Sequence, residues 1–125
     1  MFSIYSGKQL LDSKAELSAR NALDFTAVHW AAAAGKGGGA AESAIPVLAE
    51  AKADLNDRAS VFPLFRSMTP LMVAAFFNNA AEIEVLMATR ADPSLRGRYL
   101  TTRGTALDIA KAWKRGAAQA LLEGL

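Results

Sequence analysis

The sequence predicts an all-α fold in which pairs of short antiparallel helices stack side by side. Three observations support this prediction. Helix-start signals recur along the chain, small apolar residues follow them at helical spacing, and units close on an alanine followed by an acidic residue. Because one short helix pair cannot bury its own apolar face, the recurrence indicates that neighbouring pairs bury each other.

The clearest unit runs from Thr69 to Asp92, TPLMVAAFFNNAAEIEVLMATRAD. Thr69 is expected to cap a helix with its hydroxyl group. Pro70 suits the first helical position, since the N–H that it lacks would have no partner there. The pair Asn78-Asn79 can adopt the left-handed backbone conformation that ends a helix. The unit therefore predicts two antiparallel helices joined by a short turn.

Two further helix starts are in register with this unit. Thr26 opens TAVHWAAAAG, and Thr105 opens TALDIAKAW. An alanine-acidic pair closes a unit at Ala53-Asp54 and again at Ala91-Asp92. A similar pair, Ala15-Glu16, precedes the first start, so we expect the chain to begin inside a unit.

This pattern resembles the ankyrin repeat, which runs roughly TPLHxAAxxGHxxVVxLLLxxGADxN over about 33 residues. The segments Thr69–Asp92 and Leu10–Gly35 follow the pattern without a gap. The connections within 26–54, 54–69 and 92–105 are longer than the pattern. The resemblance covers nearly the whole chain and implies an ankyrin-repeat solenoid with finger loops that project to one side.

The resemblance treats residues 1–125 as a single ankyrin-repeat domain in four parts. These are a partial N-terminal repeat with its finger (1–25), a repeat with insertions (26–68), a second full repeat (69–104) and a C-terminal capping repeat (105–125). Helices are expected from about Ala27 to Ala34, and from about Ser43 onwards. The last helix pair is expected within Ala106–Leu122, ending at Gly124.

Composition and charge exclude some classes of protein and of functional site. The chain has 125 residues, 52% of them hydrophobic, which favours one folded domain, and no apolar run approaches the roughly 20 residues that cross a bilayer. The absence of cysteine excludes disulfides and thiolate chemistry. A net charge of +2 permits an acidic partner, whereas nucleic acid would require a broader basic face. The N-terminus lacks the apolar stretch of a secretory signal, so the cytoplasm is the default compartment and an organelle stays open.

Lys36 and His29 are the candidates for nucleotide binding and for catalysis, but the sequence around each favours a structural role. Lys36, in GKGGGA, lacks the spacing of a phosphate-binding loop and follows a helical pattern rather than a strand, so a flexible insertion is favoured over nucleotide binding. His29 is the only histidine. It occupies the TPLH position of the resemblance, which implies a structural tie between neighbouring units. We therefore predict no catalytic residue, no cofactor and no metal site.

Aromatic residues follow the alanine pairs of the helix-start segments. By the resemblance, Phe76, Phe77 and Trp113 occupy positions that face the concave surface, and aromatic side chains are frequent anchors at protein interfaces. The second finger, residues 55–68, is unusually apolar and contains Phe62 and Phe65. Either this finger folds over the aromatic positions and hides them, or it stays free and offers its own phenylalanines to a partner.

The third finger, residues 93–104, is basic. It contains Arg96, Arg98 and Arg103, with Tyr99 between them. Guanidinium groups pair with carboxylates and phosphates, which favours an acidic partner surface. The alternative is a loop whose charges only keep it solvated.

The resemblance implies a non-catalytic protein–protein interaction module, a scaffold or adaptor that binds another protein through finger loops and inner helices. One alternative is a permanent structural subunit of a large multiprotein assembly, and a third is a nucleotide-binding protein that uses the GKGGGA loop. The residues expected to bind the partner are Phe76, Phe77, Trp113, Phe62, Phe65, Arg96, Arg98, Tyr99 and Arg103.

Overall fold

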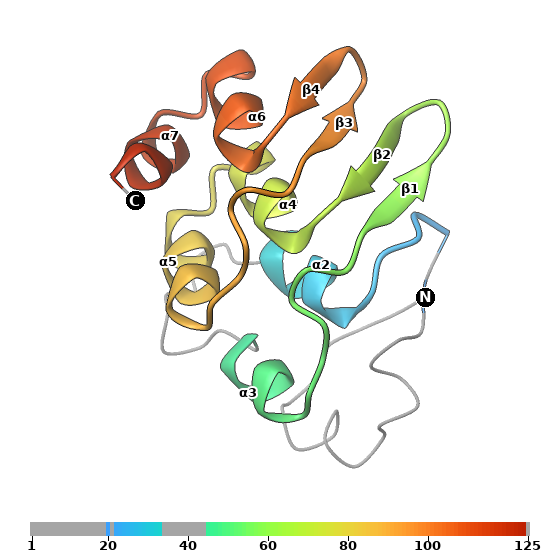
Figure 1. Ribbon diagram of the computed structural model, residues 1–125, viewed down its shortest axis with the longest axis vertical. Coiled ribbons are helices and arrows are strands. Elements are labelled where there is room, and N and C mark those ends of the chain that lie inside the picture. The colour runs from blue at the N-terminus through green and yellow to red at the C-terminus, as the bar shows by residue number, and fades with distance from the viewer. Residues whose placement is uncertain (1–19, 21, 34–44, 125) are drawn as a thin grey trace.

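The computed structural model describes residues 20, 22–33 and 45–124, which form helix pairs beside a four-stranded antiparallel sheet (Figure 1). The prediction of an all-α fold is therefore wrong, because this part of the chain mixes helices with strands. Two predicted helix boundaries lie outside the described residues. They are the end of the first inner helix at Ala34 and the start of the next helix near Ser43. Most of the partial repeat at the N-terminus (1–19 and 21) and the GKGGGA segment also lie outside the described residues.

The elements alternate between helix pairs and hairpins along the chain. The helices are α2 (Ala27–Ala33), α3 (Ile45–Glu50), α4 (Pro70–Phe76), α5 (Ala80–Ala88), α6 (Ala106–Ala112) and α7 (Gly116–Glu123). The strands are β1 (Ala59–Val61), β2 (Phe65–Met68), β3 (Gly97–Tyr99) and β4 (Thr102–Gly104). Figure 1 shows the hairpins on one side of the inner row α2, α4 and α6, with α5 and α7 on the other side.

The three predicted helix starts are confirmed, since α2, α4 and α6 begin directly after Thr26, Thr69 and Thr105. The Thr69 hydroxyl oxygen accepts a hydrogen bond from the Met72 N–H at 3.3 Å, and Pro70 is the first residue of α4. At the start of α6, Thr105 and Asp108 form a reciprocal capping box. These bonds satisfy N–H groups that have no partner inside the helix. Helices α4 and α6 therefore begin at fixed residues.

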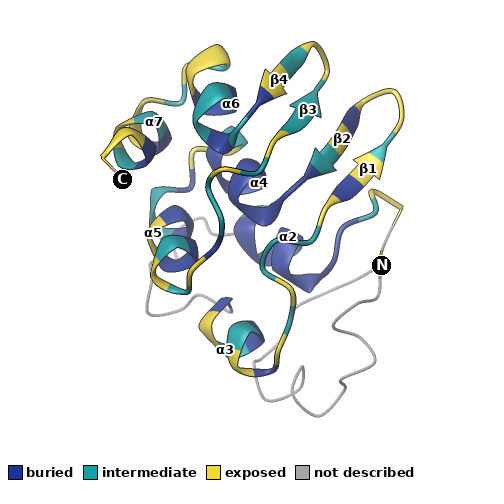
Figure 2. Cartoon of the chain, viewed as in Figure 1, coloured by how far each residue is buried: buried dark blue, intermediate teal, exposed yellow. Residues whose placement is uncertain are grey.

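Small side chains allow the inner helices to approach closely. Helix α4 packs against both α2 and α6. On these three helices, the alanines with no exposed surface are Ala27, Ala32, Ala74, Ala75, Ala106 and Ala110. Figure 2 shows α2 and α4 as largely buried and α6 as partly buried, whereas the hairpin tips and the ends of the outer helices are exposed. The interior is close-packed around alanine, so a larger side chain there would force neighbouring helices apart.

The second and third fingers, which the sequence presented as loops, are β-hairpins. They pair with each other through β2 and β3, giving the strand order β1-β2-β3-β4. A hairpin of strands this short is marginally stable alone. Pairing the two hairpins into one four-stranded sheet stabilises both. Gly97 allows the close approach, because a Cβ atom there would lie 2.5 Å from the Ser67 carbonyl oxygen.

His29 joins the first described inner helix to the end of β2. Its Nδ1 accepts a hydrogen bond from the Thr26 N–H at 3.2 Å, so the proton is on Nε2, which lies 2.8 Å from the Met68 carbonyl oxygen. The side chain is completely buried, and burial lowers the pKa of His29 below its ordinary 6.5. The neutral imidazole is therefore a structural link between successive units.

Asparagine side chains add further links between helix pairs. Asn79 donates through Nδ2 to the Ala32 carbonyl oxygen at 2.7 Å, which satisfies a free carbonyl at the end of α2. Asn78 has the predicted left-handed backbone, with φ of 57°, and its Oδ1 accepts from the Ala118 N–H at 2.9 Å. One short turn thus contacts both the preceding and the following unit.

Stability is expected to fall as the pH decreases through the range where histidine titrates. Because the folded state lowers the pKa of His29, the unfolded chain binds a proton below pH 6.5 that the folded chain does not bind. The free energy of unfolding should decrease by up to about 1.4 kcal/mol per pH unit in this range and level off below the folded-state pKa. Urea denaturation between pH 7.5 and 5.5 measures the slope.

The variant His29→Gln is the control, since the chain has no other histidine. Its free energy of unfolding should be lower than that of the wild type at pH 7.5, and its pH dependence over this range should be much weaker. An equal slope in both proteins would show that His29 is not the group responsible.

Candidate functional site

Three of the predicted partner-binding residues form one aromatic cluster. The rings of Phe76 and Trp113 meet edge to face, with centroids 5.4 Å apart. Tyr99 reaches the same place from β3, and its ring lies 4.5 Å from Phe76 and 5.5 Å from Trp113. The sequence grouped Tyr99 with the arginines, whereas the sheet places its ring on the aromatic side. Such contacts stabilise a fixed ring arrangement beyond the burial of area.

The aromatic cluster continues along the inner face of the sheet. Phe65, on β2, stacks with Tyr99 at 6.5 Å and lies 5.9 Å from Phe25, the residue before Thr26. Phe65 is only 6% exposed, so this part of the second finger does turn inward. Phe62 at the hairpin tip is 78% exposed, and Phe77 is 48% exposed. The finger therefore covers part of the aromatic surface and leaves the rest open.

An apolar groove lies where the hairpins meet the inner helices, with a cavity of about 210 Å³. Its lining is almost entirely apolar, and the exposed side chains Leu23, Leu64 and Phe77 belong to it. The complete lining is Leu23, Phe25, Leu64, Phe65, Met68, Val73, Phe76, Phe77 and Tyr99. We call this the aromatic groove.

The C-terminal unit holds the wall of the aromatic groove in place. Arg115 donates through Nε to the Phe76 carbonyl oxygen, and its guanidinium group lies 5.1 Å from the centre of the Phe76 ring. This is a cation–π contact combined with a hydrogen bond. Within the described residues, the Nε1–H of Trp113 is buried without an acceptor. Phe76 is thus a fixed wall of the groove, and Phe77 beside it is accessible at the rim.

The opposite face of the sheet is cationic. Arg66 pairs with Arg98 across β2 and β3, and Arg98 pairs with Arg103 across β3 and β4. Residues directly opposite each other in an antiparallel sheet share a face, so these three side chains lie on one face. Phe65 and Tyr99, one position along, lie on the other. We call Arg66, Arg98 and Arg103 the arginine rung.

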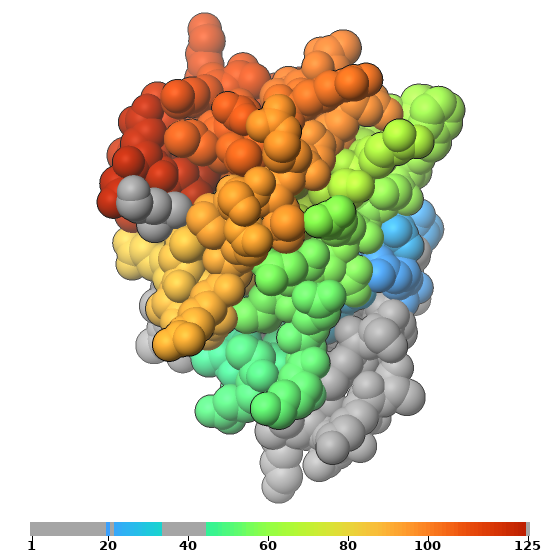
Figure 3. Space-filling view, viewed as in Figure 1, coloured from blue at the N-terminus to red at the C-terminus, as the bar shows by residue number. Residues whose placement is uncertain are grey.

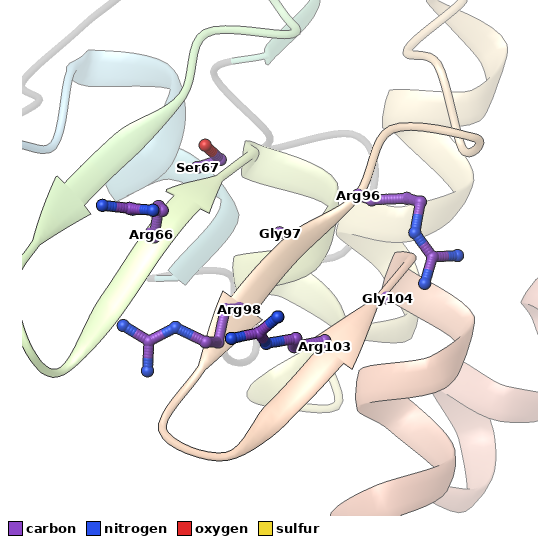
Figure 4. Close-up of a pocket in the computed structure, with 7 residues that line it drawn as sticks. All are labelled: Arg66, Ser67, Arg96, Gly97, Arg98, Arg103 and Gly104. Carbon is purple, nitrogen blue, oxygen red and sulfur yellow. The ribbon is translucent and has the colours of Figure 1, made fainter.

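The arginine rung borders a shallow hollow of about 360 Å³ (Figure 4). Its lining is Arg66, Ser67, Arg96, Gly97, Arg98, Arg103 and Gly104. Figure 4 shows the Arg96 side chain extending away from the other three arginines. Figure 3 shows the tips of the two hairpins projecting from the body of the molecule. The hollow itself is shallow and opens onto the surface of the sheet.

Within the described residues, no carboxylate lies in ion-pair distance of the arginine rung. Arg98 donates to the Leu100 carbonyl oxygen at 2.6 Å, which satisfies part of one guanidinium group. Like charges placed directly opposite each other destabilise a sheet. The arrangement thus favours binding of an anion. Sequence reasoning missed Arg66, because only the β2–β3 register places it beside the third finger.

Other kinds of site find little support in the described part of the chain. His29 is completely buried, and both its ring nitrogens lie within hydrogen-bond distance of other groups, so it is not positioned for catalysis. Among the described residues, no group of three acidic, histidine or cysteine side chains is placed to hold a metal ion. The described helices are also too short to cross a bilayer.

Comparison with known proteins does not assign a function to these surfaces. No protein-family model matches the sequence, and no curated protein matches it. The functional argument therefore depends on the aromatic groove and the arginine rung themselves.

Removing one arginine from the rung is expected to stabilise the fold at low salt. Arg103 is exposed, and Arg103→Thr relieves the repulsion from Arg98 while supplying a good strand-forming residue. The free energy of unfolding should rise by about a few tenths of a kcal/mol at 10 mM salt. The gain should disappear at 1 M salt, where the screening length is about 3 Å. Denaturant titration at both salt concentrations tests this.

Arg58→Thr is the matched control. Arg58 is also exposed, but it lines a different hollow together with Asp54, Asp57 and Asp92. Its removal should leave stability unchanged or lower it at low salt. A low-salt stabilisation equal to that of Arg103→Thr would mean that general net charge, and not the rung, causes the effect.

Proposed function

We propose that this chain is a non-catalytic protein-interaction domain that binds a segment of a partner protein in the aromatic groove. The observation that carries the proposal is Phe77, which is 48% exposed at the rim of a fixed aromatic cluster. The resemblance to ankyrin repeats supports the same function. In this proposal the paired hairpins and the inner helices together provide the binding surface.

The exposed apolar residues are concentrated rather than scattered. Leu23 is 39% exposed, Leu64 is 47% exposed, and both line the same groove as Phe77. Single exposed apolar residues are ordinary, whereas a contiguous group marks an interaction surface. Covering these side chains would gain about 25 cal/mol for each Å² of apolar area removed from water. The gain would favour a partner with apolar side chains of its own.

The dimensions and chemistry of the aromatic groove favour a protein over a small molecule. Its cavity of about 210 Å³ is smaller than the roughly 300–1,000 Å³ of a small-molecule site. It also has few polar groups to orient a ligand. Such a groove suits one or two large apolar side chains presented by a partner chain, with the surrounding surface making further contacts. Arg115 holds one wall, Phe76, which lowers the cost of ordering that side chain on binding.

Truncating Phe77 is expected to weaken the complex without disturbing the fold. Phe77 is at the exposed end of α4, so Phe77→Ser removes an anchor and leaves the core alanines in place. A partner captured from the source organism with the tagged wild type would be identified by mass spectrometry, and its affinity measured by calorimetry. The dissociation constant should increase at least tenfold, or about 1.4 kcal/mol.

Glu84→Ser serves as the control for this experiment, because Glu84 is exposed on the outer helix α5. It should bind the partner as the wild type does. If Phe77→Ser is folded by circular dichroism and retains wild-type affinity, the groove is not the binding surface.

A further inference from the structure

The arginine rung is a feature that the aromatic groove does not explain. Its three arginines lie on the opposite face of the sheet from Phe65 and Tyr99. A protein segment bound in the groove would therefore not neutralise them. Adjacent strands are about 4.8 Å apart, so the rung places three cationic groups across a strip about 10 Å wide. This is a compact cationic surface with a defined geometry.

The surroundings of the rung leave it accessible to a ligand. Gly97 and Gly104 have no side chains, so they contribute only backbone atoms to the lining of the hollow. Ser67 and Arg96 complete this lining. Among the described residues, no carboxylate lies within ion-pair distance of the arginines. The face therefore combines donors, space and unbalanced positive charge.

We propose that the arginine rung binds a phosphate monoester carried on a serine or threonine side chain of a protein. A phosphorylated side chain has a charge of about −1.5 to −2 near neutral pH and three strong acceptor oxygens. Guanidinium groups match such oxygens with pairs of parallel hydrogen bonds. Clusters of arginine are a recurrent means of recognising phosphorylated segments. One phosphate would relieve the mutual repulsion of the three arginines.

The same observations disfavour an extended polyanion. Nucleic acid calls for a long basic track and, for single strands, aromatic rings on which bases stack. Here the cationic strip is about three strands wide, and the sheet's aromatic rings, Phe65 and Tyr99, face the other way. The net charge of the chain is only +2. A compact dianion fits this surface better than a phosphodiester backbone does.

The test uses a fluorescent pool of nine-residue peptides that are degenerate except for a central phosphoserine. The matched pool has serine at that position. Fluorescence polarisation with the full chain should show binding of the phosphoserine pool at least ten times tighter than that of the serine pool, and weakening as salt increases. Arg66→Gln should reduce the phosphoserine affinity at least tenfold. Arg66 is exposed, so this substitution should leave the fold intact.

Two variants on other surfaces test whether phosphoserine binding depends specifically on the arginine rung. Arg58→Gln removes an exposed arginine outside the rung, and Phe77→Ser alters the aromatic groove, so both should bind the phosphoserine pool as the wild type does. This separates the two proposals, since phosphopeptide binding can fail while the groove still binds its partner. Equal binding of both pools, or equal loss in Arg58→Gln, would overturn the arginine site.

Competition with other anions decides between ligand classes. A 20-nucleotide single-stranded RNA and vesicles containing phosphatidylserine are the two competitors. If either displaces the phosphoserine pool at a lower concentration than unlabelled phosphoserine peptide does, the proposal of a phosphoprotein ligand is wrong. Weak displacement by both supports it.

Discussion

The pairing of β2 with β3 is the interaction on which both candidate surfaces depend. It joins two fingers that are far apart in the sequence, placing Phe65 opposite Tyr99 and Arg66 opposite Arg98. The alternation of side chains along a strand then gives the sheet one aromatic face and one cationic face. Without this pairing, the groove would lose a wall and the arginine rung would lose Arg66.

The helices explain why these two strands meet. Strand β2 continues through Thr69 into α4, and β4 continues through Thr105 into α6, so the spacing of the inner helices sets the spacing of the hairpins. Alanines without exposed surface let α4 and α6 pack closely. His29 adds a hydrogen bond to the Met68 carbonyl oxygen at the end of β2. Helix packing and strand pairing therefore support each other.

Local signals in the sequence predicted the local features correctly and missed the sheet. Thr69 caps a backbone N–H three residues away, and Asn78 adopts a left-handed conformation of its own backbone. Both features could therefore be predicted from a few residues. Strands of three or four residues carry too little alternation to be recognised, and the turn at Leu100 has none of the usual glycine signals of a hairpin. The cluster of Phe76 with Trp113 followed from the repeat spacing, whereas the places of Tyr99 and Arg66 depend on long-range register.

Nuclear Overhauser contacts between the two fingers test the central claim most directly. In the full chain, backbone contacts from Arg66 to Arg98 and side-chain contacts from Phe65 to Tyr99 should be present, since these residues are register partners. Their presence would establish one sheet with two chemically different faces. Contacts confined to each finger, β1 with β2 and β3 with β4 alone, would contradict this account.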